Sequence, residues 1–322
     1  MKNLIFILIS VLLLSSCEAT FFEKEPDTNV QAVFEEIWTN FDEYYAPFEE
    51  RNVDWDALYA EFRPQLNTNS TEEDLYRVVT QMITKLDDGH ISLTVPDKKV
   101  YFANHVFREK PEDNLFNKDV IQTNYLKGQF EKDEFTFYGK IGNIPYINLN
   151  VVNAEWSHLQ DAIQLNPDAP GIIIDLRHNQ GGDFTFAKQA VEKLNPEKRL
   201  VFKSRTKNGP GKEDFTTWYE WYLEAKGNYT GKILVLIDRY TISAGERATL
   251  ILKSMPNVTL IGEATNGALS TMVARGVSNG WYHTLATQDV IAFNGEVYEG
   301  KGIPADVPVK NTLERLAQGK DD

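Results

Sequence analysis

Ser243 stands at the kind of junction where an α/β protein can present a nucleophile. An unbroken apolar run over Ile233–Ile237 precedes it, and a helical apolar pattern follows over Ala244–Met255. Such a run is typical of a strand buried on both faces of a parallel sheet. A serine between that strand and the helix is in a position to act as a nucleophile. The stretch Ser243-Ala-Gly-Glu246 also fits a capping box, which is the purely structural interpretation.

A second strand-to-helix junction carries paired glycines in Asp175-Leu-Arg-His-Asn-Gln-Gly-Gly182. Gly181 and Gly182 allow backbone conformations that turn N–H groups into a cavity, where they can bind an anion or a developing oxyanion. Arg177 is expected to fix the loop by pairing with Asp175 or a neighbouring carboxylate. The alternative is a tight turn with a surface arginine. The spacing excludes a Walker loop and a dinucleotide fingerprint.

The histidines supply a candidate base but no predicted metal site. None of the five pairs with another at metal-ligand spacing on one helix. His90 follows Gly89 at the seam between a helical segment and the α/β part, and such seams favour functional sites. A solvated loop histidine is the alternative.

Five short motifs occur in the order Leu86-Asp-Asp-Gly-His90, Asp175-Leu-Arg-x-Asn-x-Gly-Gly182, Thr241-Ile-Ser-Ala-Gly-Glu246, Gly262-Glu-Ala-Thr-x-Gly267 and Glu299-Gly-Lys-Gly-Ile-Pro-Ala-Asp306. Together they resemble the tail-specific (C-terminal processing) serine peptidase family. The resemblance implies a crotonase-like ββα core and Ser243 as nucleophile. It also implies that the backbone N–H groups of Ala244 and of Gly181 or Gly182 serve as oxyanion donors, and no cofactor.

The chain departs from the family pattern in its base and in its length. Processing proteases carry a basic lysine just after the fourth motif, whereas Ala268 and Leu269 follow Gly267 here. The tricorn-like branch instead resembles a relay of histidine and glutamate, which implies His90 as general base and Glu299 as its partner. The interval between the first motif and the core is too short for the PDZ domain found in many relatives.

The first 28 residues predict export and anchoring. Residues 1–16 have a lysine, a short apolar core and small residues, and Leu14-Ser15-Ser16-Cys17 looks like a lipobox. Cys17 is the only cysteine, so lipidation would account for it; an ordinary secretory signal is the alternative. Residues 17–28 would form a tether at the bacterial cell envelope, periplasmic or surface-facing.

Net charge argues against nucleic acid as a partner. The formal charge of the chain is −14, and removing a leader whose one charge is Lys2 leaves −15. Such an acidic surface disfavours nucleic acid and anionic lipid as partners of the folded part.

Three segments are expected after the tether. Residues 29–95 predict a small helical domain, with helices over Asn29–Tyr45 and Trp55–Phe62 and a third opened by Ser70 or Thr71. Residues 96–134 are interpreted as a connector, with a flap over a site as the alternative. Residues 135–322 predict the α/β core, in which Asp214–Lys226 is an aromatic-rich helix or flap.

The leading functional hypothesis is a lipid-anchored serine peptidase acting on peptides or unfolded protein ends. A binding protein on the same fold, holding a peptide or hydrophobic ligand, is the alternative, and an esterase is a third. A histidine base predicts that activity falls on acidification between about pH 8 and pH 5.

Overall fold

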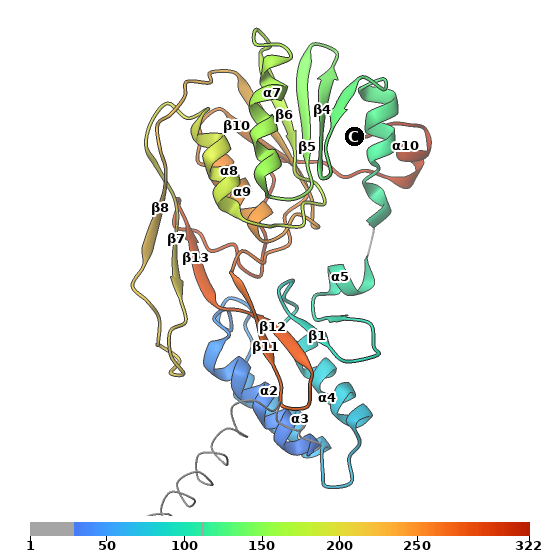
Figure 1. Ribbon diagram of the computed structural model, residues 1–322, viewed down its shortest axis with the longest axis vertical. Coiled ribbons are helices and arrows are strands. Elements are labelled where there is room, and N and C mark those ends of the chain that lie inside the picture. The colour runs from blue at the N-terminus through green and yellow to red at the C-terminus, as the bar shows by residue number, and fades with distance from the viewer. Residues whose placement is uncertain (1–28, 111–112) are drawn as a thin grey trace, which may run out of the picture.

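The computed structural model describes residues 29–110 and 113–322, so that the predicted leader, Cys17 and the tether lie outside the described residues. Figure 1 shows a sheet-based core at one end and the N-terminal helices at the other. This mixed α/β architecture, with a small helical region and a large sheet core, confirms the predicted fold class. In the part of the chain that the structure describes, every helix is too short or too polar to cross a membrane.

The core is built on a seven-stranded sheet in the order β14-β10-β9-β6-β5-β4-β3. The strands from β14 to β5 run parallel, and β4 and β3 complete the sheet antiparallel. Their bounds are β3 Phe130–Lys132, β4 Thr136–Ile141, β5 Ile144–Leu149, β6 Gly171–Asp175, β9 Lys232–Ile237, β10 Val258–Gly262 and β14 Val307–Pro308. The two apolar runs at β6 and β9 are neighbours, as expected of strands that helices cover.

Three helices pack on this sheet: α7 (His158–Gln164), α8 (Phe184–Glu192) and α9 (Ala244–Lys253). One hydrophobic core joins them to the strands, with Trp156, Leu159, Val191, Leu250 and Ile233 among its members. Because α8 and α9 each follow a parallel strand, their N-terminal ends lie at the carboxyl edge of the sheet, where α/β proteins place their sites.

The N-terminal helices have the predicted bounds to within a few residues. They are α2 (Val30–Tyr44), capped by Asn29, α3 (Trp55–Phe62), capped by Asp54, and α4 (Glu72–Thr84), capped by Thr71. Thr71 and Asp74 form a complete capping box at the start of α4. Apolar residues at helical spacing form a second core, which includes Phe34, Ile37, Phe41, Val78 and Met82.

A hairpin from late in the sequence completes the helical unit. Strands β11 (Met272–Gly276) and β12 (Tyr282–Ala286) form a four-stranded sheet with β1 (Ser92–Thr94) and β2 (Tyr101–Phe102), in the order β11-β12-β1-β2. Trp281 and Leu285 of the hairpin lie in the same hydrophobic core as α2 and α4. The structure therefore differs from a division at residue 95, since this hairpin packs with the helices and not with the seven-stranded sheet.

The segment predicted as connector, with a flap as the alternative, contains short helices and strands and contributes to the wall of a cavity. It contains β2, α5 (His105–Glu109), the helical turns Asp113–Leu115, Lys118–Val120 and Ile121–Tyr125, and edge strand β3. It joins the two units, and Phe102 and Phe107 line the main cavity of the core.

The aromatic-rich stretch is a strand and not a helix. Strand β8 (Tyr219–Leu223) pairs with β7 (Arg199–Thr206), which also pairs with β13 (Gln288–Ala292). Cross-strand pairing and the packing of Trp221 on Phe202 outweigh the helical spacing of the aromatic residues.

Candidate active site

Ser243 sits in a strained turn directly before helix α9. Its backbone angles are φ 60° and ψ −122°, a left-handed conformation that serine rarely adopts. Its N–H donates to the carbonyl of Ala268 at 3.1 Å and to Glu246 Oε2 at 3.2 Å. Strain held by surrounding bonds is typical of functional positions and of nucleophile turns. The half of the predicted capping box that Glu246 contributes is thus present.

Glu246 is the buried centre of this turn. Its carboxylate accepts from the N–H groups of Ser243, Gly267 and Ala268 and from the hydroxyl of Thr265. Burial raises its pKa to about 7, and these four donors oppose the shift. The carboxylate therefore ties the Ser243 turn to the segment after β10.

The glycine turn lies against the serine. A Cβ atom on Gly181 would come within 2.7 Å of Ser243 Cβ and 3.1 Å of its Oγ, so that only glycine fits there. The N–H of Gly181 donates to Asn179 Oδ1 at 2.9 Å and is therefore already used. The N–H groups of Gly182 and Ala244 make no hydrogen bond to a described residue, and both residues line the main cavity. Of the three predicted oxyanion donors, these two have the free amides.

Arg177 fixes the glycine turn as the sequence predicts. Its guanidinium forms an ion pair with Asp175, with Nη2 2.7 Å from Oδ2, and a second one with Asp321 at 2.8 Å. Tyr146 donates to the same carboxylate of Asp175. The buried pair anchors the loop at the end of β6.

Ser243 and His90 line one cavity of about 760 Å³. The wall also contains Gly182 and Ala244 and is largely apolar elsewhere, with contributions from Phe102, Phe107, Phe184, Tyr240 and Met272. The tertiary structure thus brings together three segments that lie far apart in the sequence. A cavity of this size accommodates several residues of an extended peptide.

His90 is buried, and both ring nitrogens lack a hydrogen-bond partner among the described residues. Its backbone N–H donates to Asp88 Oδ1 at 2.8 Å, which fixes the turn that carries it. Burial lowers the pKa of the imidazole to about 4, against the opposing effect of Asp88. The ring is therefore neutral at pH 7, the form that can accept a proton.

Glu299 binds Arg51 and two backbone amides, and makes no hydrogen bond to His90. Its Oε1 accepts from Arg51 Nη2 at 2.7 Å, and its Oε2 accepts from the N–H groups of Leu269 and Ser270. Arg51 also pairs with Asp88 at 3.3 Å and donates to the carbonyl of Gly267. Arg51 thus connects the helical unit, the turn before His90 and the segment after β10. In this geometry Glu299 supports the site through Arg51 and the backbone.

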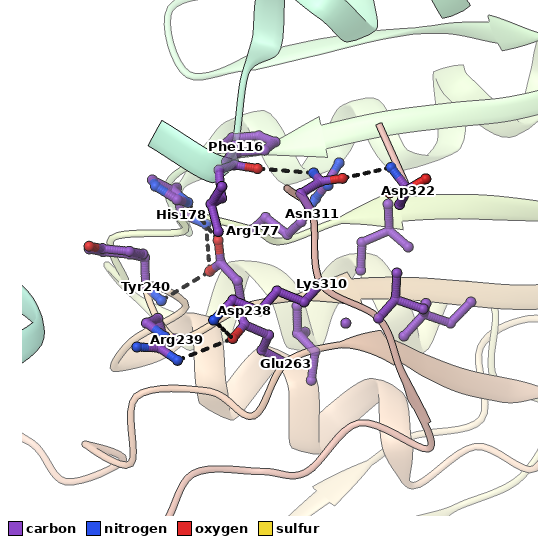
Figure 2. A pocket seen from close by; sticks show the side chains of 16 residues that line it. Phe116, Arg177, His178, Asp238, Arg239, Tyr240, Glu263, Lys310, Asn311 and Asp322 are labelled. Carbon is purple, nitrogen blue, oxygen red and sulfur yellow. Dashed lines mark hydrogen bonds and ion pairs between the residues drawn. The ribbon is translucent and has the colours of Figure 1, made fainter. Parts of the chain in front are cut away.

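His178 is a second histidine on the cavity wall, which sequence reasoning did not select. Its Nδ1 lies 2.6 Å from Asp238 Oδ2, and its ring stacks on Tyr240 at 4.4 Å. Figure 2 shows this arrangement, with Phe116 on the other side of the ring. Asp238 raises its pKa against the effect of burial. Its position between Arg177 and the glycine turn is the feature of the sequence that could have identified His178 as a residue of the site.

Comparison with known proteins gives matches over most of the chain. The model of peptidase family S41 matches residues 143–309, and that of the tricorn protease C1 domain matches residues 26–84. A protein from Parabacteroides merdae is similar in structure, with 24% identity, a TM-score of 0.82, and coverage of 92% of this chain and 94% of that one.

Two further structures share the fold at lower identity. A lipoprotein from Streptococcus agalactiae has 16% identity and a TM-score of 0.57, over 92% of this chain and 96% of that chain. The photosystem II D1 C-terminal processing protease has 14% identity and a TM-score of 0.54, over 92% of this chain and 98% of that chain.

The family model spans more than half of the chain and includes the Ser243 turn, the glycine turn and Glu299, while the tricorn match falls on the N-terminal helices. The chain therefore belongs to peptidase family S41, as a serine peptidase of the tricorn-like kind.

Proposed function

We propose that the protein hydrolyses peptide bonds in peptides or unfolded protein ends, with Ser243 as nucleophile and His90 as general base. The observation that carries the proposal is the shared cavity, which is lined by Ser243, His90 and the two residues with free amides, Gly182 and Ala244. A strained serine, a neutral imidazole and two N–H donors are the parts that acyl transfer requires.

The reaction follows from these roles. Ser243 Oγ attacks the carbonyl carbon of the peptide bond while its proton passes to His90, and the two amides stabilise the oxyanion. The C–N bond then breaks, and His90 returns the proton to the leaving amine. Water, deprotonated by His90, hydrolyses the acyl-enzyme and restores the serine.

His90 is preferred to His178 because of its free ring nitrogens. Both ring nitrogens of His178 lie within hydrogen-bonding distance of other groups. Its Nδ1 is close to the carboxylate of Asp238, and its Nε2 lies 3.2 Å from the carbonyl of Asp113. Neither ring nitrogen of His90 has such a partner among the described residues, so both remain uncommitted. In unliganded enzymes the bond between serine and base is often long and forms only with substrate.

A fluorophosphonate probe and a broad peptide library test the proposal together. Labelling and hydrolysis should both disappear in Ser243→Ala and persist in Ser270→Ala, a matched control because Ser270 lines the same cavity. His90→Ala should lower both rates by at least about 100-fold, and His178→Ala should not. Tight binding of a peptide or hydrophobic ligand with no labelling would favour the non-catalytic alternative.

We also propose that the protein is lipid-anchored at the bacterial cell envelope through Cys17. The lipobox Leu14-Ser15-Ser16-Cys17 and the absence of a second cysteine in the sequence support this. A structural relative, the Streptococcus agalactiae protein, is described as a lipoprotein. Cells fed an alkyne-tagged fatty acid should label the wild-type protein and not Cys17→Ala. Release of unlabelled, processed protein would instead indicate an ordinary secretory signal.

A further inference from the structure

Arg247 lies beside the proposed nucleophile. It is four residues after Ser243 in the first turn of α9, and its N–H donates to the Ser243 carbonyl at 3.1 Å. Because Ser243 is the N-cap residue of α9, both residues lie at the same end of this helix. Arg247 is 4% exposed and lines the same cavity as Ser243 and His90.

The guanidinium is held only by neutral groups. Nε donates to the carbonyl of Leu269 at 2.8 Å, and Nη2 donates to Gln288 Oε1 at 2.6 Å and to Thr271 Oγ1 at 3.3 Å. The rings of Phe184 and Phe202 lie 5.0 and 5.4 Å away. These contacts fix the buried cation in the cavity wall. Nη1 makes no hydrogen bond to any residue that the structure describes.

Two other buried arginines show that the lack of an ion pair at Arg247 is unusual. Arg177 pairs with two carboxylates, Asp175 and Asp321, and Arg51 likewise pairs with Asp88 and Glu299. Within residues 29–110 and 113–322, no carboxylate lies within ion-pair distance of Arg247. Glu299 and Glu246 are the carboxylates that act electrostatically on Arg247, and both accept hydrogen bonds from other donors. A buried cation without an ion pair is costly, and proteins rarely retain one without use.

We propose that Arg247 binds a carboxylate of the substrate, on a residue flanking the scissile bond. The inference rests on the proposed function of Ser243. The carboxylate would accept from Nη1, since both N–H groups of Nη2 are already donated, and would give the guanidinium a counter-charge, with Phe184 excluding water. The same chemistry can come from an Asp or Glu side chain or from the terminal carboxylate of a peptide cleaved near its end. The preferred substrates would then be acidic at the cleavage site, although the protein itself is acidic.

The experiment measures selectivity, because Arg247 also joins α9 to the segment around Leu269. Fluorogenic peptides carry Glu or Gln at each position flanking the scissile bond, and free or amidated C-termini in a second series. The wild-type enzyme should favour one carboxylate over its amide by about 10- to 100-fold in kcat/KM, as expected for a charge-assisted hydrogen bond. The two series distinguish a side-chain from a chain-end carboxylate.

Variants separate recognition from structure. In Arg247→Met the acid-to-amide ratio should fall to about one, and Arg247→Lys should retain part of it. Arg275→Met is the control, since Arg275 lies over the ring of Tyr44 and outside the cavity. A wild-type ratio near one, or an Arg247→Met variant that loses activity equally on acid and amide peptides, would overturn the inference.

Binding to Ser243→Ala keeps this inference apart from the proposed function. If the wild-type enzyme cleaves no peptide and is not labelled by a fluorophosphonate, the proposed function fails. Fluorescence anisotropy would still show whether Ser243→Ala prefers a Glu peptide to its Gln counterpart and loses that preference when Arg247→Met is added. If Ser243→Ala binds the Glu and Gln peptides with equal affinity, that result alone rejects the proposed binding of a substrate carboxylate by Arg247.

Discussion

The pH profile of kcat/KM tests whether His90 is the general base, because burial changes the pH at which this histidine takes up a proton. At its ordinary pKa, 6.5, His90 would lose activity steeply below neutral pH. In the structure, burial of the ring lowers its pKa to about 4. The unliganded enzyme should then keep His90 neutral well into the acidic range.

At about pH 5, the neutral fraction of the base differs by more than an order of magnitude between a buried and an ordinary histidine. A base with a pKa of about 4 remains about 90% neutral there, whereas one with a pKa of 6.5 is only about 3% neutral. We therefore expect kcat/KM to change by less than about 2-fold between about pH 7.5 and pH 5. The sequence alone predicts a fall over this range; the burial of His90 moves that fall to lower pH.

The assay is hydrolysis of a fluorogenic peptide at low substrate concentration, with a probe-labelling rate as second readout. Circular dichroism at each pH controls for acid unfolding. His178→Gln is the matched variant, since the pKa of His178 is raised by Asp238. The wild-type and variant profiles should have the same shape.

A midpoint above about pH 6 that disappears in His178→Gln would refute the argument and identify His178 as the base. A midpoint near pH 7 that survives in this variant would point to Glu246, whose pKa burial raises to about 7.

Three further predictions concern stability. Arg51→Met leaves two buried carboxylates without their cation and should lower the free energy of unfolding by about 3–5 kcal/mol in urea titrations, whereas Arg63→Met, at a partly exposed pair, should cost less than about 1 kcal/mol. Equal effects of the two substitutions would contradict a stabilising role of the buried Arg51 ion pairs with Asp88 and Glu299. Glu246→Gln turns an NH₂ group toward backbone donors and should cost about 2 kcal/mol or more, with loss of labelling at Ser243. His283 is buried on Phe41, and burial lowers its pKa to about 4, so the unfolded chain binds protons more readily below about pH 6.5 and stability falls as pH drops toward 4. His283→Phe should flatten this fall in thermal melts, and an unchanged slope would show that other groups cause it.

The sequence predicts much of the local structure because caps, periods and glycine turns are short-range signals. Helices α2, α3 and α4 begin at or next to the expected residues, and the apolar runs at β6 and β9 form the centre of the sheet. The packing of the β11–β12 hairpin was not predicted, since no local signal specifies that it packs on helices more than 180 residues earlier in the chain.

At the site, the sequence by itself determined the position of Ser243 before α9, the paired glycines in the turn after β6 and the pairing of Arg177 with Asp175. Each depends on residues adjacent in the chain. Only the tertiary structure decided that His90 is buried on the Ser243 cavity, that Glu299 binds Arg51, and that Arg247 faces the same space with neutral partners only. The reason is physical: a pKa, an ion pair or a missing counter-charge depends on which distant groups fold around a side chain, and spacing along the chain carries no record of them.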